Sequence, residues 1–335
     1  MCIVHSIEEL VGNTPLMELR RYGSQLDIGA HIFAKLEGFN PSGSVKDRAA
    51  LNMIIAAEEQ GILSPGDTIV EQTSGNTGIG LAAMACARGY KVKIFLERGA
   101  SLERRFLLQA YGAELLTYKD ALGIRTEEEK KKGWQEPERE ALHKEIYAYC
   151  EREGGFFLNQ AYNRANPQAH YQTTGPEIWR DTGGDVDILV CMAGTGGTGY
   201  GTSRYLREKN PDLRVVLAQP HSDCRITQEH PDANIIDGVL PVYGVPEYEL
   251  TDYLNPVWSD EYFDVRIEDC CATAKQLVHA EGLLMGTSSC AALWAAGIVG
   301  GRKENKGKNI VVIMPDDGLK YLSTYLYRQN ECREK

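Results

Sequence analysis

Lys46 is the residue of this sequence whose type and position most clearly indicate chemistry. It lies in the stretch 40–48, where Asn-Pro and Ser-Gly pairs predict a turn and Ser44 is a good helix N-cap. Apolar residues at helical spacing continue to Gly61, which places Lys46 in the first turn of a helix. Burial and the positive end of the helix dipole would both lower the pKa of its amine, as attack on a carbonyl carbon requires. The competing interpretation of a single lysine is an amine that reaches solvent from the turn.

A loop after a predicted strand at 68–71 carries hydroxyl and amide groups. It consists of Thr73, Ser74, Gly75, Asn76 and Thr77, and a predicted helix follows it. These side chains, with the free backbone N–H groups of a helix N-terminus, suit a small carboxylate. The competing interpretation is an ordinary strand–helix turn with a good cap.

A glycine-rich loop follows a second apolar strand and opens another helix. It consists of Gly194, Thr195, Gly196, Gly197, Thr198 and Gly199. Such a loop suits a phosphate, although the same spacing occurs in dinucleotide-binding fingerprints. No acidic residue follows the next predicted strand, at 214–218, and the glycines lie late in the chain. We therefore favour a monophosphate over a pyrophosphate.

Hydroxyl groups also gather in the segment 281–290, at the start of a further predicted helix that contains Ser288. A nucleophilic lysine, a phosphate loop and a carboxylate loop together indicate pyridoxal 5′-phosphate bound as a Schiff base. The sequence thus predicts a cofactor enzyme from three separate loops.

Strands and helices that alternate along the chain must bring these loops together. Strands are predicted at 32–36, 68–71, 91–96, 188–192, 214–218 and 309–314. Helices are predicted at 7–10, from the turn at Ser44 to Gly61, from 79 to a stop at Gly89, and at 102–111, 203–208, 270–280 and 288–299. The alternation predicts an α/β fold with two doubly wound domains and mainly parallel sheets. A cleft between the two halves is the expected ligand site.

Two segments depart from this alternation. The segment 126–153 is highly charged and predicts a solvated surface helix, whose second half keeps an apolar stripe through Leu142, Ile146 and Tyr149. The segment 219–265 is rich in turn residues and has little hydrophobic periodicity, so its secondary structure is the least predictable of the chain.

Composition narrows the function classes. The 335 residues are 43% hydrophobic and 25% charged, as in a globular protein, and the net charge of −11 argues against nucleic acid or an anionic membrane as partner. No apolar run approaches the roughly 18 residues of a membrane span, and no signal-peptide pattern opens the chain. The nine cysteines are scattered, without a C-x-x-C pair, which predicts a reduced, cytoplasmic setting and no metal site.

The order and the residue identities of these motifs resemble those of the cysteine synthase and cystathionine β-synthase family of fold type II pyridoxal-phosphate enzymes. The resemblance covers about residues 7 to 325 and depends on the motifs at 12–16, 41–48, 73–78, 166–167, 173–179, 194–199, 315–316 and 321–324. So many matches in one order make a chance resemblance improbable.

The resemblance implies a role for each loop. Lys46 would form the Schiff base and, once displaced by substrate, would carry the Cα proton. Asn76 would hydrogen-bond the cofactor's 3′ oxygen, and Ser288 would face the pyridine nitrogen. The substrate carboxylate would be bound by Thr73, Ser74, Gly75, Thr77 and Gln160. The phosphate would be held by Gly194, Thr195, Gly196, Gly197 and Thr198.

A neutral hydroxyl at Ser288 leaves the pyridine nitrogen unprotonated, and an unprotonated ring withdraws electrons from the Cα atom less strongly. In the family this goes with β-elimination through an aminoacrylate, followed by addition of a nucleophile at Cβ.

The sequence departs from the family where a glutamine or glutamate normally precedes Gly-Ile-Gly. Here the stretch 235–241 places Asp237 at that point, and the second glycine is missing. A carboxylate there could protonate a departing hydroxide or activate a water or thiol, or it could cap a turn. Asp232 is a weaker candidate for the same task, and Cys290 replaces a usual glycine after the paired serines. The segment 120–155 is also longer than in plain cysteine synthases.

We predict a β-replacement enzyme that acts on a small amino acid such as serine, O-acetylserine or cysteine. One version adds sulfide to O-acetylserine. The other uses serine or cysteine with Asp237 as acid/base, and it forms serine, lanthionine or cystathionine while water or hydrogen sulfide leaves. Synthesis of a diaminopropionate with an amine nucleophile is a more distant alternative.

From other classes, the alternatives are a non-catalytic regulatory relative, which the intact Lys46 argues against, and a nicotinamide dehydrogenase built on the glycine loop. We expect a smaller domain at 41–155, a larger domain at 1–40 and 156–335, and a homodimer, as is common in the family. We also expect no regulatory domain after residue 325 and no haem-binding extension before residue 7.

Overall fold

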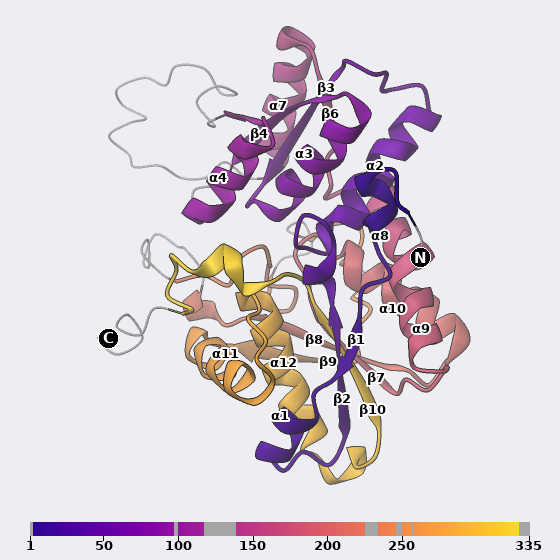
Figure 1. Ribbon diagram of the computed structural model, residues 1–335, viewed down its shortest axis with the longest axis vertical. Coiled ribbons are helices and arrows are strands. Elements are labelled where there is room, and N and C mark those ends of the chain that lie inside the picture. Colours follow the sequence, from indigo (N-terminus) through magenta and orange to yellow (C-terminus); the bar gives the residue numbers. More distant parts are fainter. Residues whose placement is uncertain are drawn as a thin grey trace.

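Two twisted β-sheets organise the chain in its computed structural model, and Figure 1 shows the smaller sheet above the larger one. The structure describes residues 3–96, 100–116, 139–224, 234–245, 250–255 and 257–327. Within these ranges, no helix combines the length and the hydropathy that a membrane crossing requires.

The larger sheet has six strands. Their order is β1 (Leu16–Glu18), β2 (His31–Leu36), β10 (Asn309–Met314), β7 (Ile188–Met192), β8 (Arg214–Pro220) and β9 (Glu261–Val265). Only β1 pairs antiparallel with its neighbour, and the other pairs are parallel.

The smaller sheet has four parallel strands. Their order is β5 (Glu114–Leu116), β4 (Lys91–Leu96), β3 (Thr68–Thr73) and β6 (Phe156–Phe157). Because β6 pairs with β3, this sheet extends to Phe157.

Helices cover both faces of each sheet, as the parallel strands require. The helices of the larger sheet are α1 (Arg20–Gln25), α8 (Ala165–Ala169), α9 (Gly175–Asp181), α10 (Gly197–Lys209), α11 (Ile267–Glu281) and α12 (Thr287–Gly300). The helices of the smaller sheet are α2 (Lys46–Glu59), α3 (Asn76–Arg88), α4 (Leu102–Ala110) and α7 (Arg139–Glu153). Short helical turns are η1 (Ile7–Leu10), η2 (Glu37–Phe39), η3 (His170–Thr174), η4 (Ser222–Cys224), η6 (Lys303–Asn305) and η7 (Gly318–Tyr321).

The two-residue period of the strands divides the core of the larger sheet between its faces. Val190 and Val312 point to the face that α1, α11 and α12 cover, whereas Leu189 and Val311 point to the face of α9 and α10. Figure 1 shows these two groups of helices on opposite sides of the sheet. The strands therefore read as continuous apolar runs, because both of their faces are buried.

The predicted α/β architecture is confirmed, and the predicted strands at 91–96, 188–192 and 309–314 match their observed bounds. The segment 139–153 forms α7, and Leu142, Ile146 and Tyr149 pack against the smaller sheet as predicted. Its charged first half lies outside the described residues. β9 lies in the segment 219–265, for which the sequence predicted no strand. An edge strand with alternating exposure carries no continuous apolar run that would reveal it.

Candidate functional site

Lys46 is the first residue of α2, and the turn before it is held by side-chain hydrogen bonds. The backbone N–H and the hydroxyl of Ser42 both donate to the carboxylate of Asp47. Ser44 Oγ accepts from the backbone N–H of Lys46 at 3.3 Å. The helix is assigned from Lys46, but Val45 already has helical dihedral angles, and Ser44 Oγ accepts from a first-turn N–H as the predicted N-cap should.

Lys46 as a residue is half-buried. Burial lowers its pKa to about 8, against an opposing effect of the Asp316 carboxylate. Among the residues that the structure describes, none hydrogen-bonds the Lys46 Nζ atom. An amine with this pKa is partly unprotonated near neutral pH, as a nucleophile toward a carbonyl carbon must be.

The loop 73–77 joins the end of β3 to the start of α3. Gly75 has a φ angle of 143°, a conformation that glycine adopts readily, and its N–H donates to Thr73 Oγ1 at 3.0 Å. Thr77 Oγ1 donates to Gln160 Oε1 at 2.6 Å, across 83 residues of sequence. The structure thus brings together Thr77 and Gln160, which we predict to bind the same carboxylate.

A buried carboxyl group, that of Glu71 in β3, lies next to the loop 73–77. Glu71 is 1% exposed and accepts hydrogen bonds from the backbone N–H groups of Gln72 and Gln160 at 2.9 and 3.2 Å. Burial raises the pKa of Glu71 to about 8. The folded protein therefore prefers its protonated form at neutral pH.

A pH dependence of stability follows from Glu71. Its pKa is higher in the folded chain, about 8, than the ordinary 4.5, so its contribution is complete at low pH. We expect the free energy of unfolding to fall as pH rises between these two values, and Glu71→Gln to flatten that fall. Urea unfolding at several pH values measures this, with the exposed Glu59→Gln as the control. Equal slopes in wild type and Glu71→Gln would contradict the prediction.

The glycine loop joins β7 to α10 and contains close backbone contacts. Gly196 has a φ angle of 90°, and a Cβ atom on Gly194 would lie 2.3 Å from the carbonyl oxygen of Gly238. A Cβ atom on Gly197 would lie 2.4 Å from Asn166 Oδ1. Asn166 Nδ2 donates to Thr195 Oγ1 at 2.9 Å and holds the loop in place.

The replacement Gly194→Ala is expected to reduce cofactor retention by more than tenfold. Its methyl group would collide with a backbone atom, which cannot move aside as a flexible side chain can. The 330–500 nm absorbance of the dialysed protein, per mole of chain, measures the retention. Gly23→Ala is the matched control, because a Cβ atom at Gly23 meets nothing within 4 Å. Equal retention in the two variants would argue against a phosphate cradle at Gly194.

Electrostatic contacts connect Lys46 to both loops. His170 Nε2 lies 3.2 Å from Thr198 Oγ1, and burial, Arg48 and Lys46 together hold the pKa of His170 well below its ordinary value. Asp316 Oδ2 accepts from Asn76 Nδ2 at 2.7 Å, and the same carboxylate acts on Lys46. Lys46, the carboxylate loop and the glycine loop therefore surround one region of the protein.

Ser288 is buried in the first turn of α12. The neighbouring Thr287 Oγ1 is buried, and no hydrogen-bond partner for it occurs in the described part of the chain. The same holds for Asn76 Oδ1 in the carboxylate loop. Buried polar atoms of this kind indicate a polar ligand, because an unpaired buried acceptor or donor is costly.

These donors fit pyridoxal phosphate. The first turn of α10 offers N–H groups without helical partners to a phosphate, and Lys46 offers an amine to an aldehyde carbon. Asn76 offers an amide whose oxygen is unpartnered among the described residues. The amine, the amide and the phosphate loop correspond to the three polar parts of the cofactor.

Asp237 is buried, and its segment contacts both loops. The next residue, Gly238, is the one whose carbonyl oxygen contacts Gly194 in the glycine loop. Gly238 also lies against the loop 73–77, because a Cβ atom on it would be 3.6 Å from Ser74 Oγ. Burial raises the pKa of Asp237, against an opposing effect of Arg104. Asp232, the weaker candidate, lies outside the described residues.

Arg104 is a site residue that the sequence reasoning missed. It is 2% exposed, and its Nη1 lies 3.3 Å from Asp237 Oδ1. The available signal was the spacing in α4, where Ser101, Arg104 and Leu108 occupy the buried stripe. A charged residue at a core position of an amphipathic helix indicates a buried partner.

A buried ionic cluster behind Lys46 was also missed. Arg48 donates to Glu37 and to Glu177 with N–O distances of 2.7 Å, and Lys35 Nζ lies 2.7 Å from Glu177 Oε2. These four side chains come from four different elements and are nearly inaccessible to solvent. Their charges cancel, and the cluster fixes the first turn of α2 against the larger sheet.

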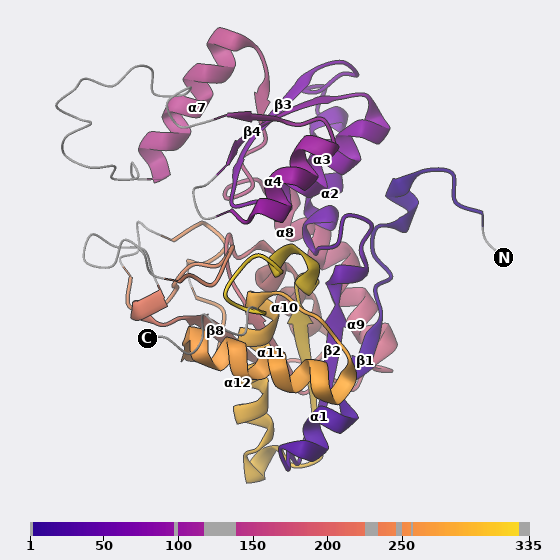
Figure 2. The same cartoon turned by 60° about the vertical axis from the view of Figure 1, so that its left-hand side comes forward.

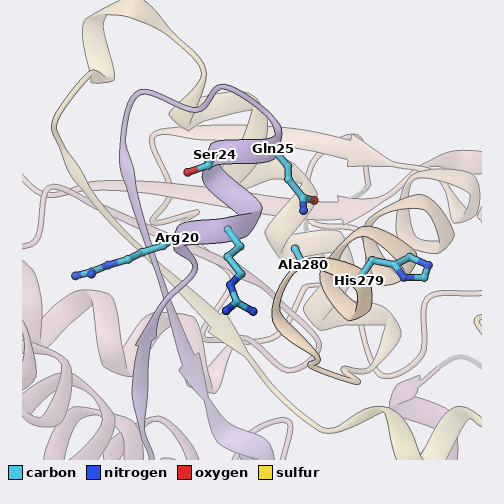
Figure 3. Close-up of a pocket in the computed structure, with 6 residues that line it drawn as sticks. Arg20, Ser24, Gln25, His279 and Ala280 are labelled. Atoms are coloured by element: carbon cyan, nitrogen blue, oxygen red, sulfur yellow. The ribbon is translucent and has the colours of Figure 1, made fainter.

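A surface hollow lies away from all of these residues, between α1 and α11 (Figure 3). Arg20 and His279 line it, but in Figure 3 their side chains point away from one another. Such a divergent arrangement does not concentrate groups on one ligand, so this hollow has no part in the candidate site.

Comparisons with known proteins agree with this geometry. The family model described as "Pyridoxal-phosphate dependent enzyme" matches residues 7–316. Cysteine synthase B of Salmonella typhimurium is 39% identical over 97% of this chain and 96% of its own length. The O-acetylserine dependent cystathionine beta-synthase of Bacillus subtilis is 35% identical over 98% of this chain and 99% of its own length.

A solved structure is similar over the same extent. The crystal structure of a hydrogen sulfide-producing enzyme from Fusobacterium nucleatum superimposes with a TM-score of 0.80 at 33% identity. The match covers 96% of this chain and 100% of the other. The likeness therefore extends over nearly the whole of both chains.

Proposed function

The chain belongs to the pyridoxal-phosphate-dependent enzymes of the cysteine synthase and cystathionine β-synthase family, and we propose that its first substrate is O-acetylserine and its nucleophile sulfide. Family membership makes it an enzyme that replaces a group at Cβ of a small amino acid. The names of the B. subtilis relative and of the cysteine synthases support O-acetylserine as the substrate. One structural observation carries the proposal, namely the amine of Lys46, whose pKa burial lowers to about 8 and on which the Asp316 carboxylate, itself bonded to Asn76 of the loop 73–77, acts.

Pyridoxal phosphate, when bound, supplies an electron sink for the Cα atom of the amino acid. We propose that Lys46 binds it, that Gly194, Thr195, Gly196, Gly197 and Thr198 hold its phosphate, and that Asn76 and Ser288 orient its ring. The contacts that support this are the glycine packing at 194 and 197 and the unpartnered oxygen of Asn76 among the described residues.

The amino acid must be held so that its Cα–H bond faces Lys46. We propose that Thr73, Ser74, Gly75, Thr77 and Gln160 bind its carboxylate. The bond between Thr77 and Gln160 supports this, because a carboxylate inserted there would accept from both side chains. Lys46, with a pKa of about 8, then takes the proton from Cα and holds it while the acetate leaves Cβ.

Asp237 supports a second candidate function, in which cysteine or serine replaces O-acetylserine. Hydroxide and hydrosulfide are poorer leaving groups than acetate and gain from a proton donor. Asp237 is buried, its neighbour Gly238 lies against Ser74, and burial raises the pKa of Asp237 toward the range of a general acid. The hydrogen sulfide-producing relative from F. nucleatum is consistent with such chemistry.

The two candidates separate in one experiment. O-acetylserine, serine and cysteine are added in turn to the purified, cofactor-loaded protein, and the visible absorption band is followed with and without sulfide. We expect O-acetylserine to change the band and, with sulfide, to yield cysteine and acetate. A response to cysteine or serine that Asp237→Asn abolishes would assign the second function instead. A wild-type protein without a visible band would overturn both.

Assembly and location remain proposals of the same kind. We propose a homodimer in the cytoplasm, on the basis of the family and of the scattered cysteines, among which no disulfide forms within the described ranges. The predicted division into a smaller domain at 41–155 and a larger domain at 1–40 with 156–335 shifts slightly in our proposal, because β6 at 156–157 belongs to the smaller sheet.

A further inference from the structure

The guanidinium group of Arg104 lies close to Tyr321, Asp237 and Asp316. Its Nη2 donates to Tyr321 Oη at 2.6 Å, and its Cζ lies 4.8 Å from the centre of the Tyr321 ring. Its Nη1 lies 3.3 Å from Asp237 Oδ1, and its Nη2 lies 4.0 Å from Asp316 Oδ2. Its aliphatic part covers Gly75, where a Cβ atom would lie 2.4 Å from Arg104 Cδ.

The hydroxyl of Tyr321 continues this chain of contacts into the site. It donates to Asp316 Oδ2 at 2.7 Å, and the same oxygen accepts from Asn76 Nδ2 at 2.7 Å. Arg104 is therefore connected through Tyr321 and Asp316 to the amide that we propose to orient the cofactor ring. Its other connection, to Asp237, is direct.

These contacts join the two layers of the protein. α4, which carries Arg104, packs on the smaller sheet, whereas Asp316 and Tyr321 follow β10 of the larger sheet. Figure 2 shows α4 directly beside the C-terminal segment, drawn in yellow. Ser101 Oγ donates to the Lys320 carbonyl oxygen at 2.8 Å, and Glu103 accepts from the Ser323 N–H at 2.8 Å. The first turn of α4, immediately before Arg104, is thus fixed to the larger layer by two residues.

Two nitrogens of Arg104 remain without a hydrogen bond. Nε and Nη1 are buried and have no aligned acceptor among the residues that the structure describes. A cation that only stabilised the packing of α4 would satisfy its donors more fully, since unpaired buried donors are costly. The arrangement keeps a positive charge beside two carboxylates at the edge of the site.

We infer that Arg104 is a positioning residue, which fixes the carboxylate of Asp237 directly and the amide of Asn76 through Tyr321 and Asp316. The inference rests on the proposed function, since it assigns Asp237 and Asn76 to the reaction. It makes the orientation of both groups depend on the docking of α4 against the C-terminal segment.

The electrostatics of Asp237 agree with this inference. Burial raises the pKa of Asp237, Arg104 lowers it, and Asp316 raises it. Tyr321 and Tyr325 also face this carboxylate. Arg104 is the cation that favours the ionised form, so its loss would raise the pKa of Asp237 further.

The test compares Arg104→Gln with Arg105→Gln. Arg105 is the adjacent residue of α4, is half-buried, and makes no side-chain hydrogen bond or ion pair within the described ranges. Both variants are loaded with pyridoxal phosphate. Their visible spectra are titrated with pH, and kcat/KM is measured against pH with O-acetylserine and sulfide and separately with cysteine.

We expect Arg104→Gln to retain the cofactor, because Lys46 and the glycine loop do not touch Arg104. Its kcat/KM should fall by at least about tenfold. The acid limb of its pH profile should move up by about one pH unit, because an opposite charge has been removed beside a carboxylate. Its visible band should shift in position or in pH dependence, since Tyr321 and Asp316, which hold the Asn76 amide, lose their contacts with Arg104. Arg104→Lys should return the acid limb of the pH profile to its wild-type position, because the positive charge is kept. It should recover only part of kcat/KM, because an ammonium lacks the planar, two-pronged donor geometry of a guanidinium.

The inference is overturned if Arg104→Gln matches Arg105→Gln in both the pH profile and the spectrum. It is equally overturned if only thermal stability changes, which would leave Arg104 a purely structural residue. A wild-type protein that lacks the band would instead refute the proposed function. If Arg104→Gln does not fold, Arg104→Lys and Asp237→Asn complete a double-mutant cycle. Additive losses in that cycle would overturn the inference, and a double variant no worse than Asp237→Asn would support it.

Discussion

Replacing Lys46 by alanine is expected to remove the visible absorption band of the bound cofactor and to lower kcat/KM by at least about a thousandfold. The amine holds two tasks in our proposal, attachment of the cofactor and transfer of the Cα proton. Loss of both in one substitution explains the size of the expected effect.

The matched control is Lys91→Ala, at an exposed position in β4. Both variants are purified in the presence of pyridoxal phosphate, dialysed and scanned, and the spectra are compared per mole of chain. Far-UV circular dichroism establishes that both are folded. A folded Lys46→Ala protein that keeps the band and its turnover would refute the assignment of Lys46.

Replacing Arg48 by methionine is expected to lower the free energy of unfolding by about 3–5 kcal/mol. The change leaves the carboxylates of Glu37 and Glu177 in the interior, where Arg48 now contacts them at 2.7 Å. Removal of one partner of a buried ion pair is costly because the remaining charge cannot recover its hydration. Urea denaturation at neutral pH measures the loss.

The exposed pair between Arg20 and Glu18 provides the control, and Arg20→Ala should cost less than about 1 kcal/mol. A comparable loss in both variants would show that the buried cluster contributes no more to the free energy of unfolding than an exposed ion pair does.

The same cluster predicts an acid dependence. Burial raises the pKa of Glu177, but the hydrogen bonds and charges of Arg48 and Lys35 outweigh it and lower the pKa to about 2. Because the folded pKa is depressed, this contribution to stability is present above about pH 4.5 and disappears as pH falls toward 2. In Arg48→Met the decline across that window should be smaller, because Glu177 loses its principal partner.

Local patterns in the sequence determined most of the architecture and the loops that carry chemistry. Buried parallel strands give continuous apolar runs, which is why β7 and β10 could be predicted to the residue. The turn before Lys46, the loop 73–77 and the glycine loop also depend on residues that are adjacent in the chain. Such features are readable because the interactions that form them are short in sequence.

Only the tertiary structure decided which distant side chains meet. Arg104 and Tyr321 are 217 residues apart, and Arg48 and Glu177 are 129 apart. Nothing in the local pattern around an arginine specifies which carboxylate will neutralise it, because that choice depends on how two layers pack. The sequence therefore determined the reactive amine and the loops around it, whereas the packing of α4 and α2 on the larger sheet decided which charges hold them in position.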